Sequence, residues 1–246
     1  WGTRLGDDMR HRHNKMNANE KLTLMAVGDI TLKTSGNTSP FRRVEKTLSR
    51  KDVLFGNLET VLSARGKELQ KSTLLHSLPA NAEYLKEAGF DVVNIANNHI
   101  MDMGKDGLDD TLEALRENRV TFIGAGNQKY HKAYTIIERK GIKLGFLGYD
   151  EGGHQTSRNG VFINRIDKHI LQDIRRLKTK CDLVIISLHW GIEHVFYPSP
   201  KQIAFARMLI DNGASIILGH HPHFVQGIER YKHGLIAYSL GNFQFN

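Results

Sequence analysis

Short runs of consecutive apolar residues alternate along this chain with longer amphipathic segments. A strand that is apolar on consecutive residues is covered on both faces, as in a parallel sheet between layers of helices. Nine strands are predicted, at residues 22–28, 53–56, 92–96, 120–123, 134–138, 142–148, 183–188, 215–218 and 235–238. Five helices are predicted between them, at residues 40–49, 80–88, 105–118, 167–178 and 199–211. This alternation predicts an α/β fold built around buried strands.

Length and charge narrow the class of protein. A chain of 246 residues fits one α/β domain. Its formal net charge of +8 favours an anionic partner, such as a phosphate ester, an acidic polymer or a membrane surface. The lysines and arginines are scattered, without a basic block or interleaved aromatic residues, so no nucleic acid is expected as a partner. The single cysteine, Cys181, excludes an intrachain disulfide and a cysteine-based zinc knuckle.

The beginning of the chain is polar and shows no periodicity. We therefore predict a flexible N-terminal lead-in at residues 1–21, followed by one domain at residues 22–246. No run of 18 apolar residues occurs, so no segment is predicted to span a bilayer. The first residue is Trp1 and not Met, which leaves room for a leader or an anchor upstream.

Polar residues directly follow five of the predicted strands. These segments are Gly28-Asp29, Gly56-Asn57-Leu58-Glu59, Asn97-Asn98-His99, His189-Trp190-Gly191 and Gly219-His220-His221-Pro222-His223. In open α/β sheets, ligands bind beyond the carboxyl ends of the strands, where residues distant in sequence meet. Carboxylate, carboxamide and imidazole groups together form the ligand set of a divalent metal centre. About seven candidate ligands leave room for one metal ion or two.

Each placement also has an ordinary structural explanation when it is taken singly. Asp29 could cap a turn or a helix, and Asn97 and Asn98 suit left-handed turn conformations. His189 could be a hydrogen-bonded histidine of the core. Together the five placements favour a site, because independent accidents would not all fall at the same end of successive strands.

Six segments carry a resemblance to a known family. They are "AVGDI", "GNLE", "NIANNHIMDMGKDGLDDTL", "SLHWGIEH", "GASIILGHHPHFVQGIE" and "YSLGNFQF". In this order, between Leu22 and Phe245, they resemble the bacterial capsule-synthesis family CapA, which includes poly-γ-glutamate synthesis proteins of the PgsA type. That family is similar to the calcineurin-like metallophosphoesterases. The resemblance implies a sandwich of two mixed β-sheets flanked by α-helices, with an active site that holds two metals.

The strand-end pattern and this resemblance together assign the candidate site residues. The candidate ligands for one or two divalent ions, with manganese, zinc or iron expected, are Asp29, Asn57, Glu59, Asn98, His189, His221 and His223. His99 is adjacent to a ligand and is expected to donate a proton to the leaving group as a general acid. The residues expected to support the ligands or to contact substrate are Asn97, Glu193, His194 and His220.

The chain departs from the metallophosphoesterase motifs in three places. Thr31 stands where the first motif has its second ligand, a histidine. Asn57 stands where the second motif supplies a bridging aspartate, and Glu59 is the nearest carboxylate. In the last motif the alignment is ambiguous by one residue, and we favour His221 over His220 because His221-Pro222-His223 keeps the one-residue gap. The number of metals and the bridging ligand stay open.

Two functions fit these residues. In the first, the metal site activates water for hydrolysis of a phosphoester or similar anionic substrate, which basic residues near the pocket are expected to attract. In the second, the protein is a non-hydrolytic component that binds or exports poly-γ-glutamate together with other capsule-synthesis membrane proteins. The altered residue Thr31 favours the second function, and the retained Asn98-His99 pair favours the first.

The resemblance also implies a location. It places the protein at the outer face of a bacterial cell membrane, held by an anchor outside this chain. CapA-like proteins usually continue beyond "SLGNFQFN", so the domain at residues 22–246 is expected to be truncated at its C-terminal end.

Overall fold

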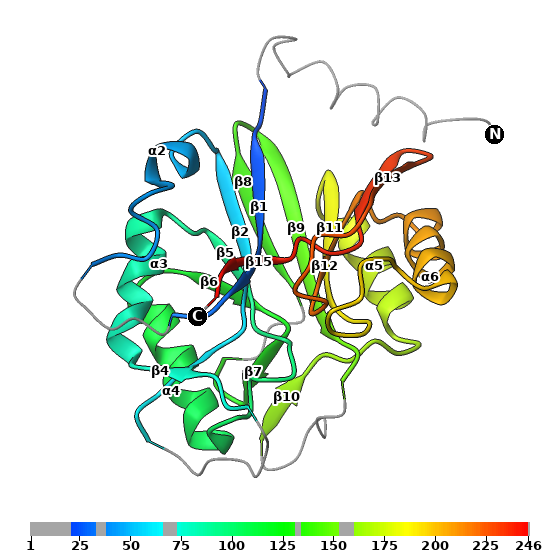
Figure 1. Cartoon of the computed structure of the whole chain (residues 1–246). Helices are drawn as coiled ribbons and strands as arrows, with labels where there is room; N and C mark the ends of the chain where they lie inside the picture. The colour runs from blue at the N-terminus through cyan, green and yellow to red at the C-terminus, as the bar shows by residue number, and fades with distance from the viewer. Residues whose placement is uncertain (1–20, 33–37, 66–72, 131–133, 153–159, 246) are drawn as a thin grey trace, which may run out of the picture.

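Two β-sheets pack face to face at the centre of the molecule, and helices cover the outer face of each sheet (Figure 1). The structure is a computed structural model, and it describes residues 21–32, 38–65, 73–130, 134–152 and 160–245. The predicted lead-in therefore lies outside the described residues, except for Lys21. The predicted α/β sandwich flanked by helices is confirmed.

The first sheet has five strands in the order β15-β1-β2-β5-β6. All its pairings are parallel, so this sheet is not mixed as the resemblance implied. Their bounds are Asn242–Gln244 for β15, Leu24–Ile30 for β1, Val53–Leu58 for β2, Val92–Asn94 for β5 and Thr121–Ile123 for β6. Its outer face is covered by α2 at Glu45–Leu48, α3 at Ala82–Ala88 and α4 at Gly104–Glu117. β2 is buried along its whole length, as its consecutive apolar residues predicted.

The second sheet has six strands in the order β13-β14-β12-β11-β9-β8, and it is mixed. The four central strands are parallel, while β13 and β8 pair antiparallel at the edges. The bounds are Ile228–Tyr231 for β13, Gly234–Ala237 for β14, Ile216–His220 for β12, Leu183–His189 for β11, Ile142–Asp150 for β9 and Thr135–Arg139 for β8. The helices on its outer face are α5 at Ile170–Lys178 and α6 at Pro200–Asp211.

Two short strand pairs and a 3₁₀ turn complete the described elements. β3 at Val61–Leu62 pairs with β4 at His76–Ser77, β7 at Ala125–Asn127 pairs with β10 at Val161–Ile163, and η1 lies at Pro79–Asn81. The helix predicted at residues 40–49 is shorter than expected. Residues 39–44 instead form turns, in which Arg42 N–H donates to Ser39 O and Val44 N–H to Phe41 O.

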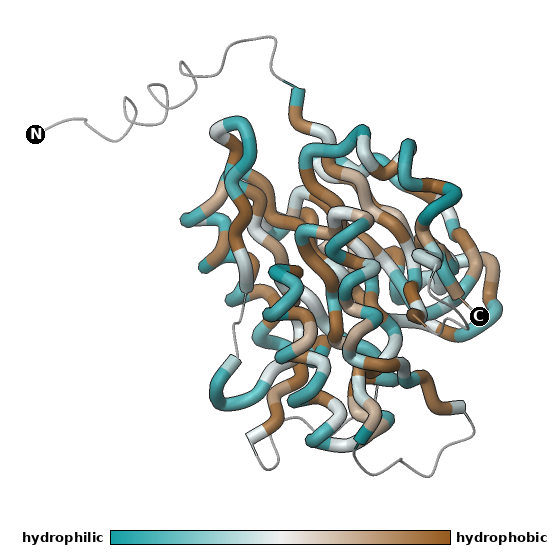
Figure 2. The backbone as a smooth tube through the Cα atoms, turned by 90° about the vertical axis from the view of Figure 1, so that its left-hand side faces the viewer, coloured by the Kyte–Doolittle hydropathy of each residue, from teal (hydrophilic) through white to brown (hydrophobic). Residues whose placement is uncertain are grey.

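The hydrophobic core has three layers, one between the sheets and one beneath each set of helices. Figure 2 shows the apolar stretches along the inner strands and the polar stretches at the outer turns. In the middle layer the rings of Phe55 and Phe146 stack with centroids 5.8 Å apart and planes 7° apart. None of the described helices is both long and apolar enough to cross a lipid bilayer.

Gly28 allows β1 to approach the segment before β15. A Cβ atom at this position would lie 1.8 Å from Gly241 O and 2.8 Å from Leu240 O. Because both atoms belong to the backbone, Gly28→Ala is expected to lower the free energy of unfolding by about 3 kcal/mol. Urea denaturation measures this loss. Gly227→Ala is the matched control, since its Cβ would meet nothing within 4 Å; equal small losses in both variants would show that the strands separate easily.

Candidate metal centre

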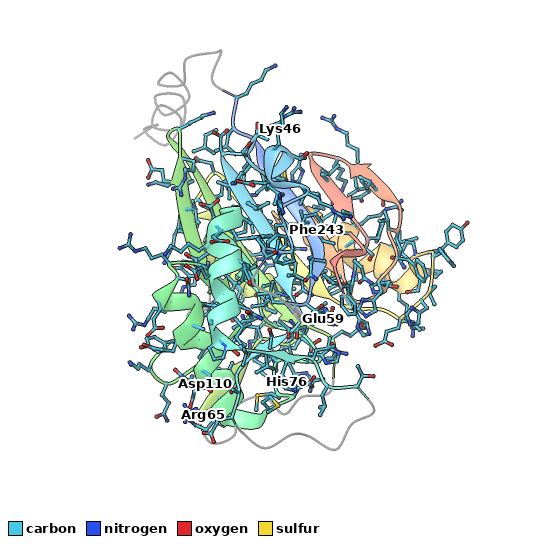
Figure 3. All side chains as sticks on the ribbon, turned by 60° about the vertical axis from the view of Figure 1, so that its left-hand side comes forward. Lys46, Glu59, Arg65, His76, Asp110 and Phe243 are labelled. Atoms are coloured by element: carbon cyan, nitrogen blue, oxygen red, sulfur yellow. The ribbon has the colours of Figure 1, made fainter. Side chains whose placement is uncertain are left out.

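The predicted site residues converge where the carboxyl ends of the two sheets meet. Asp29 is the second-last residue of β1, and Glu59 directly follows β2 in the first sheet. In the second sheet, His189 is the last residue of β11 and His220 the last residue of β12. Figure 3 shows Glu59 at the lower end of the first sheet, inside the molecule. The parallel strand order brings these distant residues to one edge, as predicted.

Glu59 is surrounded by imidazole rings. Its side chain is fully buried, and its Oε1 atom lies 3.6 Å from Nε2 of His189. The Nε2 atoms of His99 and His223 each lie 3.9 Å from the same oxygen. A buried carboxylate is costly unless it is paired or bound to a metal, so this grouping of three rings around one oxygen is typical of a ligand site.

Asp29 is the second buried carboxylate. Its Oδ1 lies 3.2 Å from Nδ1 of His220 and accepts a hydrogen bond from Asn57 Nδ2 at 2.8 Å. Its Oδ2 lies 3.4 Å from Nδ1 of His223 and accepts the backbone N–H of His221 at 3.3 Å. Burial by itself would raise the pKa of Asp29, but the bonds to His220 and His223 hold that pKa well below its usual range. Asp29 is therefore an anion at neutral pH.

His189, at the end of β11, contacts amide side chains that follow or end strands of the first sheet. Its Nε2 atom is 3.0 Å from Asn98 Oδ1, and its Nδ1 atom is 3.3 Å from Asn57 Nδ2. Burial lowers the pKa of His189 well below its ordinary value, and the neighbouring His221 adds to this effect. The ring is therefore neutral at pH 7, which is the form that binds metal ions.

The loop after β12 carries His221 and His223 with unusual backbone angles. Their φ values are 94° and 62°, in the left-handed region that L-residues seldom adopt. The ring of His221 lies 4.6 Å from that of His189, and burial lowers the pKa of His221. Burial also lowers the pKa of His223, but the hydrogen bonds to Asp29 and Asn242 and the negative charges of Asp29 and Glu193 together raise that pKa above its ordinary value. Backbone strain of this kind at two residues of one loop is typical of functional sites.

The donor atoms form two groups that fit divalent ions. One group is Asp29, Glu59 and His189, and the other is Glu59, His221 and His223; within each group the ligand atoms lie within 4.8 Å of one another. Two ligand atoms of one ion with bonds of about 2.1 Å can be at most about 4.2 Å apart. Small movements of these side chains would therefore bring the ligand atoms within bonding distance of one ion. Glu59 belongs to both groups. His220 belongs to neither, which favours His221 as the ligand.

His99 is held by a residue that the sequence did not single out. Its Nδ1 atom lies 2.6 Å from Oδ2 of the buried Asp102. The spacing from residue 99 to residue 102 could have indicated this pair. Asn97 supports the same loop, because its Nδ2 donates to Leu58 O and its Oδ1 accepts the His99 N–H. Asn97 therefore positions the loop and is not shown to contact substrate.

Glu193 and His194 lie at the outer edge of the site. Both are exposed, and the ring of His194 lies 5.9 Å from that of His223. The backbone N–H of His194 donates to Pro222 O at 3.0 Å, which ties its loop to the histidine loop. The charge of Glu193 acts to raise the pKa of His221 and His223. The supporting role of Glu193 and His194 stays a prediction.

A cavity of about 160 Å³ opens beside the donor groups. The described residues that line it are Asn98, Asp150, Glu151, Gly152, His189, Trp190, Gly191 and His221. The expected basic residues are missing from this lining.

Two residues near the donor groups were not predicted. Asp150 was missed because β9 was expected to end at Gly148. The strand continues, and pairing with β11 places Asp150 opposite His189. Asn242 was also missed, and its Oδ1 lies 2.7 Å from His223 Nδ1.

Comparison with solved structures defines the class of fold. A phosphatase from Mycoplasma pneumoniae superposes with a TM-score of 0.57 at 16% sequence identity, over 89% of this chain and 72% of that one. At such low identity the similarity concerns the fold alone, which is that of the metallophosphoesterase-like phosphatases.

The family follows from the sequence itself. Residues 3–246 match the model of the bacterial capsule synthesis protein family PGA_cap, and the chain belongs to this family. It is 37% identical to the capsule biosynthesis protein CapA of Bacillus anthracis over 97% of this chain. It is 32% identical to the PGA biosynthesis protein CapA of Bacillus subtilis over 94% of this chain. The matched region spans 62% and 65% of those two proteins, respectively. The predicted resemblance is confirmed.

Proposed function

We propose that this protein acts in the biosynthesis of a bacterial capsule polymer of the poly-γ-glutamate type, and that it hydrolyses a phosphoester or similar anionic substrate at a divalent metal centre. The names of the two Bacillus relatives support the first part. One observation carries the second part: two groups of ligand atoms share the buried carboxylate of Glu59. The proposed place of action is the outer face of a bacterial membrane, beside other capsule-synthesis membrane proteins.

The donor set indicates how two ions would be held. Asp29 and His189 would bind one ion, His221 and His223 the other, and Glu59 would bind both. Glu59 would thus replace the bridging aspartate that is absent from this chain. Carboxylate and imidazole donors without thiolate suit manganese, iron or zinc.

The amide side chains beside these donors have separate roles. Asn98 presents a neutral oxygen toward His189 and could complete the first shell of an ion. Asn57 donates to Asp29 and is itself held by a hydrogen bond from Asn94 Nδ2 to its Oδ1, at 3.0 Å. We therefore assign Asn57 to the positioning of Asp29. A ligand role for Asn57 would require its amide group to turn around.

The reaction follows from the positions of the residues. Bound divalent metals would supply an activated water and stabilise the charge that develops on the substrate. Asp102 binds Nδ1 of His99 and fixes the ring so that Nε2 is directed toward Glu59. A proton on Nε2 can then pass to the leaving group, which is the task of a general acid. The buried Asp29 and Glu59 give the centre its negative charge.

A second candidate function, binding of an anionic polymer without hydrolysis, is favoured by a different surface. A cavity of about 290 Å³ is lined by Arg116, Arg119, Lys129 and Tyr130, together with the start of β6. It lies at the opposite end of β6 from the metal centre, because β6 begins there. Three cations around one cavity suit a chain of carboxylates. This function needs no catalytic metal.

A paired assay separates the two functions. Protein purified without a histidine tag is analysed for bound metal, and turnover of bis(p-nitrophenyl) phosphate is followed with added manganese or zinc. Metal binding with turnover supports the hydrolase. Binding of poly-γ-glutamate without turnover, weakened at least tenfold by Arg119→Glu with Lys129→Glu, supports the polymer-binding component. No metal and no turnover would overturn the hydrolase.

The roles of His189 and His99 can be distinguished by substitution. His189→Ala is expected to remove most of the bound metal, because it deletes a buried donor. His99→Ala is expected to keep the metal and to slow turnover by about 100-fold or more, because it deletes only the proton donor. Elemental analysis and initial rates measure both effects. Equal loss of metal in the two variants would show that these roles are assigned wrongly.

A further inference from the structure

Exposed apolar side chains gather on two loops beside the metal centre. Of the eleven large hydrophobic residues that are exposed in the described part of the chain, seven lie on these loops or at the first residue of β13, which follows the second loop. These seven residues, which we call the apolar rim, are Ile192, Val195, Phe196, Tyr197, Phe224, Val225 and Ile228. Tyr197 is 81% exposed, Ile192 70% and Val225 69%. A contiguous apolar surface of this kind is typical of a binding site, whereas scattered exposed residues are not.

The apolar rim is continuous with the cavity of the metal centre. One loop leaves the cavity lining at Gly191 and the other at His221. Ring contacts connect the metal centre to the rim. The ring of His194 lies 5.9 Å from those of His223 and Phe224, and the ring of Phe224 lies 4.4 Å from that of Phe196.

Hydrogen bonds hold the two loops of the rim together. Gln226 Nε2 donates to Val195 O at 2.8 Å, and His194 N–H donates to Pro222 O. The rim is therefore one surface that begins at the metal ligands.

The charges near the cavity restrict what can lie along this surface. The cavity lining contains the carboxylates of Asp150 and Glu151, and no lysine or arginine among its described residues. Glu193 adds an exposed carboxylate at the start of the apolar rim. A polyanion that extended from the metals in this direction would meet like charges and apolar carbon. A hydrocarbon group would instead bury apolar surface against Phe196 and Phe224.

We infer that the substrate of the metal centre is amphiphilic: its anionic group enters the cavity, and a hydrocarbon chain bonded to that group lies along the apolar rim. This inference rests on the proposed metal centre. Glu59 and His189 are buried, so the anionic group must leave the solvent to reach them. The remainder of the same molecule would then extend along the exposed rim. The substrate class is therefore a long-chain phosphoester bound as a single molecule.

Binding of simple alkyl phosphates tests this inference without turnover. Calorimetry compares methyl phosphate with octyl phosphate, both below the concentration at which octyl phosphate aggregates, on protein with added manganese. Octyl phosphate is expected to bind at least about tenfold more tightly, because each buried methylene group strengthens binding severalfold. Equal affinity for the two phosphates, or no binding of either, would overturn the inference.

Variants of the apolar rim test whether the preference for octyl phosphate over methyl phosphate arises there. Ile192→Ser with Val225→Ser replaces two highly exposed side chains, and Phe196→Ser with Phe224→Ser replaces the paired rings. Each pair is expected to abolish the preference for octyl phosphate. Leu78→Ser is the matched control, because Leu78 is 60% exposed but lies outside the rim, and it should keep the preference. If the rim variants keep it too, the chain binds elsewhere.

Two further results distinguish an amphiphilic substrate from the proposed hydrolysis and from binding to a bilayer surface. A preference for octyl phosphate in protein that does not hydrolyse phosphodiesters would retain the amphiphilic ligand and overturn the proposed hydrolysis. Sedimentation with phosphatidylcholine vesicles, combined with equal affinity for the two alkyl phosphates, would show that the rim contacts a bilayer surface and would overturn the inference.

Discussion

Replacing Glu59 by glutamine is expected to lower the affinity for divalent metal by at least about 100-fold. A side chain that merely orients a metal ligand already contributes about 10- to 100-fold in affinity. Glu59 is common to both donor groups, so its loss would affect both ions. Glutamine has nearly the same shape but carries no charge, so the variant tests the ligand role without creating a cavity. Elemental analysis after dialysis, followed by titration with manganese, measures the change.

A nearby carboxylate provides the control for this substitution. Glu193→Gln removes an exposed charge that influences His221 and His223 but belongs to neither donor group. It is expected to leave the metal content within about twofold of the wild-type protein, since an exposed charge is screened by solvent. If Glu59→Gln bound as much metal as Glu193→Gln, Glu59 would not be a ligand.

Phe146→Ala is expected to produce the largest loss of stability, about 3–5 kcal/mol in the free energy of unfolding. Phe146 is fully buried between the two sheets and stacks on Phe55. Alanine would remove this contact and leave a cavity that neither sheet can fill, because both are fixed by their own strand pairings. Urea denaturation measures the loss through the shift in midpoint.

Two further variants test whether the loss of stability comes from the buried contact between Phe146 and Phe55. Phe196→Ala truncates an aromatic ring that is 57% exposed, and it is expected to change stability by less than about 0.5 kcal/mol. A double-mutant cycle of Phe146→Ala with Phe55→Ala should give a coupling energy of about 0.5–1.5 kcal/mol. A loss below about 1 kcal/mol for Phe146→Ala would mean that the sheets do not depend on this contact.

Most strands of both sheets could be predicted because strands that are buried on both faces consist of consecutive apolar residues. All nine predicted strands are present, within a few residues of the expected bounds. The order of the strands within each sheet was not predicted. β15 lies next to β1, although more than two hundred residues separate them, and no local pattern encodes such a pairing. The short strands β3, β4, β7 and β10 were missed because two or three residues carry no periodicity.

The candidate site was predictable to the extent that its residues terminate buried strands. Asp29, Glu59 and His189 meet because parallel strands end at one edge. The choice between His220 and His221 depended on a single residue of register. His220 closes β12 and its ring lies beside Asp29, while His221 begins the loop and its ring lies beside His189. Adjacent residues face opposite sides of a strand end, and the sequence alone did not show which of the two histidines belongs to a donor group.

Other parts of the site depend on tertiary contacts. Asp150 and Asn242 reach the site through pairing between distant strands. The apolar rim was also missed, because an exposed Phe196 or Phe224 cannot be distinguished in the sequence from a buried one. Exposure is a property of the folded chain, and the contact between these loops, in which Gln226 Nε2 donates to Val195 O, is a tertiary contact.

Anomalous diffraction from crystals grown with manganese is the most direct test of the metal centre. Two anomalous peaks are expected, separated by about 3.5–4 Å, the spacing typical of two-metal hydrolases. One peak should lie within bonding distance of Asp29 and His189, the other of His221 and His223, with Glu59 contacting both. A map with no peak within bonding distance of Glu59 would contradict the presence of a metal centre at this edge of the sheets.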